Sequence, residues 1–220
     1  MTRANSLFRW LLSNAVLAAL AFLCAGRTDL LMLRAYLGTN AALSLVAALI
    51  VDPMLLHERS TPGPAVLDPF VGIQTSFLFL STVAIAALDS GRLHWTQSIN
   101  QPVQVTALVL LAAMTAVQTW AMAVNPFFSS VIRLQTDRGH HLITRGPYRF
   151  VRHPGYFAMF LIMPTTAIAL GSWRALIPAL LYSAMIFRRT TQEDDFLRNQ
   201  LRGYPDYMSR VRYRLFPLFW

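Results

Sequence analysis

The chain has 220 residues, of which 55% are hydrophobic and 13% are charged, and its formal net charge is +9. Because soluble domains carry about 25% charged residues, this composition excludes an ordinary soluble protein and favours an integral membrane protein. Every basic residue is arginine, and the arginines crowd the ends of apolar segments, which is typical of membrane topogenesis and argues against nucleic-acid binding.

Four segments in the N-terminal part are long enough to cross a bilayer, which requires about 20 apolar residues. They are Leu7–Ala25, Ala35–Leu56, Pro69–Leu88 and Val103–Val124. The first resembles a signal peptide because arginines precede it. A second apolar segment follows almost at once, however, so we expect an uncleaved membrane-spanning helix.

The sequence changes character after residue 124, which predicts two parts, residues 1–124 and residues 125–220. The second part begins with a polar, basic stretch. It continues with two short apolar arms, at about 156–187, that predict a helical hairpin, and it ends in a basic tail. The predicted fold is therefore all-α: an integral membrane bundle of four transmembrane helices with a C-terminal helical hairpin and a cytosolic helical tail.

The arginine distribution predicts the orientation of the bundle. With the N-terminus in the cytosol, only four of the 19 arginines fall on the outer side, at positions 27, 34, 92 and 174. The positive-inside rule therefore favours cytosolic N- and C-termini.

A first polar patch extends from His140 to Tyr156. Gly146 and Pro147 predict a turn, and His153-Pro154 predicts the start of the hairpin's first helix, where proline is well tolerated. Free N–H groups at that helix start and nearby arginines would attract an anion. The alternative interpretation is a row of basic residues beside the membrane that binds lipid phosphates.

A second polar patch follows the hairpin, from Arg188 to Leu197. Helical spacing places Glu193 on an apolar stripe and turns Asp194 and Asp195 away from it. A carboxylate on a buried face needs a partner, and Arg189 could supply one from four residues earlier. Glu193 would then either form a simple helix-surface pair or reach a ligand.

The histidines at positions 140, 141 and 153 suggest a metal site only superficially. Neither a helical His-x-x-x-His spacing nor a carboxylate cluster supports one, so we expect no metal. A soluble nucleotide-binding fold is not expected either, because no Gly-x-Gly-x-x-Gly motif occurs.

Together the two patches resemble the membrane-embedded isoprenylcysteine carboxyl methyltransferase family. The resemblance rests on His140-His141-Leu142-Ile143-Thr144-Arg145-Gly146-Pro147-Tyr148, on Arg152-His153-Pro154-Gly155-Tyr156, on Glu193-Asp194-Asp195-Phe196-Leu197, and on the closing segment from Gly203 to Pro217. It departs from the family pattern at Asp194, where the family has a second glutamate. The resemblance is to a bacterial-type member, which implies the bacterial inner membrane.

The resemblance implies S-adenosylmethionine as the cofactor, bound in a cytosol-facing pocket. Its lining would comprise His140, Leu142, Gly146, Tyr148, His153, Pro154, Tyr156 and Glu193. Arg152 and Glu193 would be the catalytic polar pair nearest the reaction.

The acceptor would enter from the lipid and would be isoprenylcysteine carboxylate-like or lipid-like. A carboxylate acceptor would need no general base but would need positioning by a fork such as Arg152. An amine or thiol would need to lose a proton, with the help of His140 or His153. Two other functions stay open at this point: an NADPH-dependent reductase of the sterol-reductase type, and a non-catalytic scaffold that binds anionic membrane lipid.

Overall fold

The computed structural model describes residues 3–64, 67, 69–96 and 98–220. Within these residues the secondary structure is helical, and an isolated bridge between Leu67 and Ile132 is the only β-type pairing. The α-helices are α1 (Arg3–Ala25), α2 (Leu31–Ile50), α3 (Pro53–Ser60), α4 (Val71–Leu88), α5 (Gln101–Val124), α6 (Pro154–Ala169), α7 (Leu176–Gln200) and α8 (Tyr204–Arg210). The predicted all-α fold is confirmed.

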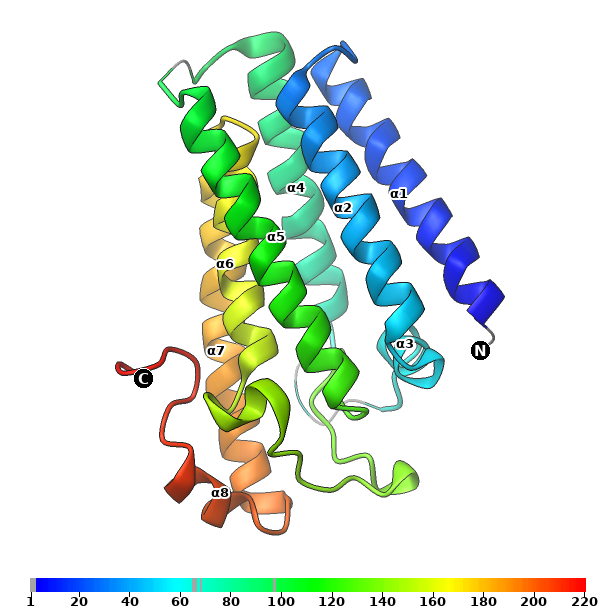
Figure 1. Ribbon diagram of the computed structural model, residues 1–220, viewed down its shortest axis with the longest axis vertical. Coiled ribbons are helices and arrows are strands. Elements are labelled where there is room, and N and C mark those ends of the chain that lie inside the picture. The colour runs from blue at the N-terminus through cyan, green and yellow to red at the C-terminus, as the bar shows by residue number, and fades with distance from the viewer. Residues whose placement is uncertain (1–2, 65–66, 68, 97) are drawn as a thin grey trace.

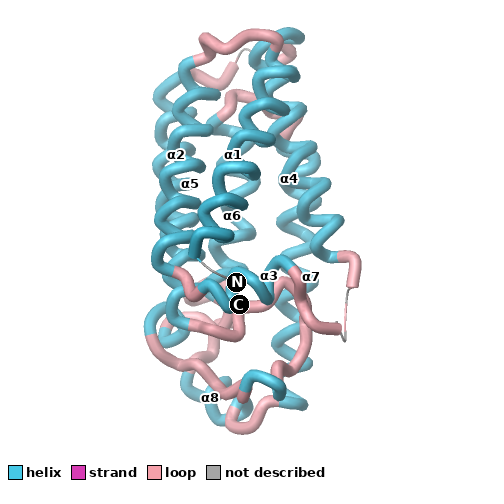
Figure 2. The backbone as a smooth tube through the Cα atoms, turned by 90° about the vertical axis from the view of Figure 1, so that its right-hand side faces the viewer, coloured by secondary structure: helices cyan, strands magenta, loops and turns pink. Residues whose placement is uncertain are grey.

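The six long helices run side by side in one elongated bundle, and the connections gather at its two ends (Figures 1 and 2). The N- and C-termini lie at the same end, together with the short helices α3 and α8 (Figure 1). Helix α5 packs along α6, and α4 packs against α1 and α7, so helices from both predicted parts share one core.

Four helices are long and apolar enough to cross a membrane: Arg3–Ala25, Leu31–Ile50, Val71–Leu93 and Gln101–Val124. Large apolar side chains such as Phe8, Leu23 and Phe77 point outward on them and are more than half exposed. Such an apolar exterior suits lipid and not water. The protein is therefore an integral membrane protein.

The second predicted span is too long at its C-terminal end. Helix α2 stops at Ile50, and a separate helix α3 begins at Pro53. Asp52 separates the two helices because its carboxylate accepts a hydrogen bond from the Met54 N–H at 2.8 Å, which caps α3. Residues 53–60 consequently lie at the end of the bundle and contribute Glu58 and Arg59 there.

The predicted hairpin is formed by α6 and α7, which a turn at Gly171 connects. Ser172 in this turn donates a 2.6 Å hydrogen bond to the buried carboxylate of Asp89, which follows α4. The turn therefore lies at the end of the bundle where α4 connects to α5, opposite the termini. Helix α7 has 25 residues and extends well beyond the 16-residue α6 toward the termini, so its last turns carry Glu193 to that end.

Pro164 lies inside α6 and lacks the N–H that would bond the carbonyl of Phe160. Ser183 of α7 donates to that carbonyl at 2.6 Å. This bond satisfies the freed acceptor within the apolar bundle, where an unpaired carbonyl would be costly, and it holds the two arms of the hairpin together.

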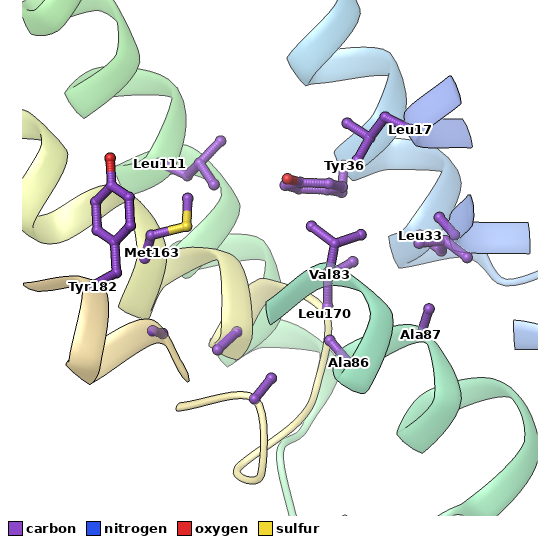
Figure 3. Packing of buried hydrophobic residues seen from close by; sticks show 14 of the residues in the cluster. Leu17, Leu33, Tyr36, Val83, Ala86, Ala87, Leu111, Met163, Leu170 and Tyr182 are labelled. Carbon is purple, nitrogen blue, oxygen red and sulfur yellow. The ribbon is translucent and has the colours of Figure 1, made fainter. Parts of the chain in front are cut away.

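The core of the bundle mixes small and large side chains. Ala86 and Ala87 of α4 are fully buried and allow close approach of neighbouring helices. Tyr36, Val83 and Met163 fill the space between the helices (Figure 3). This packing fixes the position of α6 and α7, on which the candidate site depends.

Candidate functional site

A pocket lies at the end of the bundle that holds both termini. Its walls come from residues 125–143, the start of α6, the last turns of α7, and α8. Seven of the residues predicted from the sequence line it: His140, Leu142, Tyr148, Arg152, His153, Tyr156 and Glu193. Gly146 and Pro154 do not line the pocket but shape the backbone beside it. The two sequence patches, which residues 157–187 separate along the chain, thus line the same pocket.

The turn at Gly146 packs against the C-terminal end of α5. Gly146 has φ +61°, and a Cβ there would lie 3.0 Å from the side chain of Val124. The short 3-10 helix Gly146–Arg149 that starts here buries Tyr148. Tyr148 is then fixed at both ends: its hydroxyl accepts from Asn125 at 3.0 Å, and its carbonyl accepts from the Tyr207 hydroxyl at 2.5 Å.

Pro154 occupies the first turn of α6, as predicted, and His153 is the residue before the helix. The N–H groups of Arg152 and His153 donate to the carbonyls of Tyr213 and Arg214, each at 2.9 Å. The C-terminal segment is therefore bonded directly to the start of α6 and closes one side of the site.

Asp194 is fully buried and is the electrostatic centre of the site. Arg152, itself 5% exposed, donates to both of its carboxylate oxygens at 2.8 and 2.9 Å. Further partners are His153 at 3.0 Å, the Tyr204 hydroxyl at 2.8 Å and Arg214 at 3.0 Å. Burial opposes ionisation of Asp194, but the hydrogen bonds from His153 and Arg152 hold its pKa well below the usual range.

The prediction that Asp194 turns away from the apolar stripe is wrong. The buried face of α7 continues from Ile186 through Thr190 to Asp194, at a spacing of four residues, and Asp195 is partly exposed. The reason is tertiary: residues 152–153 and 211–214 pack over this face and bring two arginines that make the burial of a carboxylate tolerable.

Arg152 and Glu193 both line the pocket, but they bind different partners. Besides Asp194, Arg152 donates to the carbonyls of Val211 and Arg212, both at 2.8 Å. Four of its five N–H donors are therefore satisfied within the protein. Its predicted role as a fork for an acceptor carboxylate stays a prediction.

Glu193 accepts a 2.5 Å hydrogen bond from the hydroxyl of Tyr156. The same hydroxyl accepts from Arg189 at 2.6 Å. Arg189 is thus connected to Glu193, as its spacing suggested, but through Tyr156. The half-buried carboxylate of Glu193 faces the pocket from a fixed position.

His140 stacks on Phe127, with ring centroids 4.5 Å apart, and its Nδ1 accepts from the Gln135 N–H at 3.3 Å. Burial, and secondarily the charges of His141 and Arg133, lower the pKa of His140 to about 4. The imidazole is therefore neutral near pH 7, with its proton on Nε2, because Nδ1 serves as the acceptor. His140 can act as a hydrogen-bond donor but not as a cation.

Arg133, which the sequence did not single out as a site residue, also lines the pocket. It donates to both oxygens of Glu58 at 2.9 and 3.0 Å and to Asp137 at 2.8 Å. Burial opposes ionisation of Glu58, but the hydrogen bonds from Arg133 and Ser129 hold its pKa below the usual value. Both arginines of the pocket wall are therefore neutralised by carboxylates behind them.

The pocket has an enclosed volume of about 70 Å³, and about 730 Å³ when its open mouth is included. Small-molecule sites occupy roughly 300–1,000 Å³. A cofactor of nucleoside size therefore needs the mouth as well as the enclosed part. Aromatic rings, a neutral imidazole and one carboxylate surround this space, a set suited to a zwitterionic or cationic ligand with a flat ring.

Comparison with known proteins points to one family. Residues 105–199 match the model of the isoprenylcysteine carboxyl methyltransferase (ICMT) family. A probable protein-S-isoprenylcysteine O-methyltransferase of rice (Oryza sativa subsp. indica) is 30% identical over 86 residues, which cover 38% of this chain and 45% of the relative. The protein-S-isoprenylcysteine O-methyltransferase of Schizosaccharomyces pombe is 29% identical over 89 residues and 36% of its length.

The matched stretches cover less than half of each relative's length. The family match nevertheless runs from α5 to the last turns of α7, and so includes the pocket-forming loop, the start of α6 and Glu193. The sequence motifs, the helical membrane bundle and these similarities agree: the chain is a membrane protein whose residues 105–199 are similar to the ICMT methyltransferase family.

Proposed function

We propose that this protein is an S-adenosylmethionine-dependent methyltransferase that acts on a lipophilic acceptor from the bilayer. The family match supports methyl transfer. The position of the pocket at the end of a membrane bundle supports an acceptor that stays partly in lipid.

The observation that carries the choice of cofactor is the charge of the pocket wall. Arg133 and Arg152 are both paired with carboxylates, whereas Glu193 is bound to a neutral hydroxyl. A sulfonium cation is attracted by such a carboxylate and by the faces of aromatic rings. NADPH carries several phosphate charges and would need unpaired cations, so the pocket favours the methyl donor over the reductase cofactor.

The protein's contribution to the reaction would be positioning and exclusion of water. S-adenosylmethionine supplies a methyl group that is already activated by its sulfonium. Tyr156 holds Glu193 in place, and the Asp194 network fixes His153 and the start of α6. Orientation of two reactants can lower a barrier by roughly 7–11 kcal/mol, so a covalent nucleophile from the protein is unnecessary.

We also propose that the pocket end faces the cytosol of a bacterial cell, across its inner membrane. The four arginines at positions 27, 34, 92 and 174 belong to the opposite end, and the other fifteen to the pocket end. That asymmetry favours a cytosolic pocket and contacts of the exposed arginines with anionic lipid.

Calorimetry of the detergent-purified protein with S-adenosylhomocysteine and with NADPH tests this function. We expect binding of S-adenosylhomocysteine alone. Glu193→Gln should weaken it at least about tenfold, the size of one charge-assisted interaction, and the neighbouring Asp195→Asn should not change it. Binding of NADPH alone would establish the reductase alternative. Binding of neither ligand by folded protein would favour the lipid-binding scaffold.

A further inference from the structure

One wall of the pocket, supplied by residues 127–133, is held in place by the short helix α3. This helix lies at the pocket end of the bundle (Figure 1) and outside residues 105–199, so the family match does not include it. Two consecutive side chains of α3, Glu58 and Arg59, bond to the wall. Arg59 donates to the Phe128 carbonyl at 3.2 Å. An element outside the matched stretch therefore shapes the pocket.

Glu58 and Arg133 form a bidentate ion pair behind this wall. The two carboxylate oxygens of buried Glu58 accept from Arg133 at 2.9 and 3.0 Å. One of these oxygens also accepts from the hydroxyl of Ser129 at 3.0 Å. Because a bidentate pair adds geometric specificity to the attraction, Glu58 determines where the guanidinium of Arg133 points.

The segment that follows α3 covers the same guanidinium. A Cβ at Gly63 would lie only 2.9 Å from Cζ of Arg133, so the guanidinium occupies the space that a side chain at position 63 would need. The side chain of Arg133 is 10% exposed. Water therefore contributes little to the compensation of its charge, and the compensation must come from acidic partners.

Two acids pair with Arg133, but their surroundings differ. Asp137 accepts from Arg133 at 2.8 Å, and its side chain is 59% exposed, whereas the side chain of Glu58 is 9% exposed. Exposed ion pairs are screened by water and contribute little, while charges in a less polar environment interact more strongly. Glu58 therefore provides most of the negative charge that cancels Arg133 in the pocket wall.

We propose that Glu58 is a specificity-determining residue: by neutralising Arg133, it lets the pocket prefer a cationic ligand over a neutral ligand of similar shape. This inference rests on the proposed methyltransferase function. Arg133 and Glu193 line the same pocket. Without Glu58, the positive charge of Arg133 would oppose the attraction of Glu193 for a sulfonium. Glu58 lies behind the wall and acts through Arg133.

The consequence for the reaction is discrimination between methyl donor and product. S-adenosylmethionine carries a sulfonium charge, and S-adenosylhomocysteine carries a neutral thioether in its place. A pocket wall without net positive charge leaves the carboxylate of Glu193 free to favour the donor. The product loses this attraction when the methyl group leaves, so Glu58 would also promote release of the product.

The test is calorimetry of the detergent-purified full-length protein with each of these two molecules, in the absence of an acceptor. The measured quantity is the Kd of S-adenosylmethionine divided by the Kd of S-adenosylhomocysteine. Glu58→Gln keeps the shape of the side chain and removes its charge, and it should raise this ratio about fivefold. Asp137→Asn, which removes the exposed partner of the same arginine, should change it less than about twofold. A purely structural role of Glu58 would weaken both ligands alike and leave the ratio unchanged.

Two further variants test whether Glu58 acts through Arg133. Arg133→Gln leaves Glu58 uncompensated and should lower the ratio. The double variant Glu58→Gln/Arg133→Gln lacks both charges and should return the ratio to within about twofold of wild type. A ratio that stays raised in the double variant, or that does not fall in Arg133→Gln, would overturn the proposal. The second comparison decides the matter even if Glu58→Gln does not fold.

Wild-type binding separates this inference from the proposed function. If wild-type protein binds both molecules and Glu58→Gln does not move the ratio, the role of Glu58 is refuted and the methyltransferase stands. If folded wild-type protein binds neither molecule, the proposed function fails and the role of Glu58 fails with it. The midpoint of thermal unfolding, measured by tryptophan fluorescence, shows for each variant that the protein is folded.

Discussion

Asp194→Asn is the most informative single substitution, because it keeps the shape of the side chain and removes its charge. Asp194 has no exposed surface and compensates Arg152, which is 5% exposed. Loss of one partner from a buried ion pair costs about 3–5 kcal/mol, since the other charge is left without compensation. Arg152 keeps its two carbonyl acceptors and Arg214 is partly exposed, so we expect about 3 kcal/mol.

For a chain of this length, 1 kcal/mol shifts the midpoint of thermal unfolding by roughly 2–4 °C. Asp194→Asn should therefore lower the midpoint by about 6–12 °C, measured by tryptophan fluorescence in detergent. It should also loosen residues 211–214, whose carbonyls bond Arg152 and the start of α6, and so speed tryptic cleavage there. Asp195→Asn, at a partly exposed position, should change the midpoint by less than about 2 °C.

The pH dependence gives an independent check of the same reasoning. The folded protein holds the pKa of Asp194 below its unfolded value of about 3.9. Its stabilisation is therefore fully present above that value and is lost only as the pH falls below it. The difference between wild type and Asp194→Asn should stay constant from pH 8 to pH 5. Equal midpoints for the Asp194→Asn and Asp195→Asn variants would refute the role of Asp194 as the centre of the network.

Three further predictions concern other parts of the molecule. The pKa of His140 is about 4 in the folded protein and about 6.5 when unfolded, so stability should fall as the pH drops from 6.5 toward 4. His140→Asn should flatten this decline in the unfolding midpoint. An unchanged slope would contradict the lowered pKa of His140. Gly146→Ala should destabilise the protein more than Gly139→Ala, because both glycines have positive φ but only a Cβ at position 146 would press on Val124. We expect about 1–2 kcal/mol from the backbone strain alone. Equal losses in the unfolding midpoint would show that the contact with Val124 does not matter. Asp89→Ala should cost about 2–3 kcal/mol by leaving the buried hydroxyl of Ser172 and the half-buried donors of Thr96 without their acceptor. The loss would be measured as a lower unfolding midpoint, and a neutral result would mean that the α6–α7 turn does not depend on this carboxylate.

Some features of the fold could be read from local sequence because they follow from composition and spacing. Apolar segments of about 20 residues predicted the transmembrane helices, and Pro154 marked the start of α6 because proline is favoured in the first helical turn. The predicted end of the second span was wrong by six residues. Asp52 caps a new helix, α3, but apolar residues lie on both sides of Asp52, so hydrophobicity alone extends the span past it. Turn and helix-start signals marked the polar patch from His140 to Tyr156, and the family resemblance implied that its residues line a pocket.

The sequence by itself determined a helical membrane protein and its two polar patches, because hydrophobic length and local turn chemistry act over short stretches of chain. The family resemblance added seven of the residues that line the pocket. Only the tertiary structure decided which acid is buried. Asp194 and Glu193 are adjacent in sequence, and the distinction between them comes from Arg152 and Arg214, 42 residues before and 20 residues after Asp194. The pairing of charges depends on segments that meet only when the bundle packs, which no local pattern records.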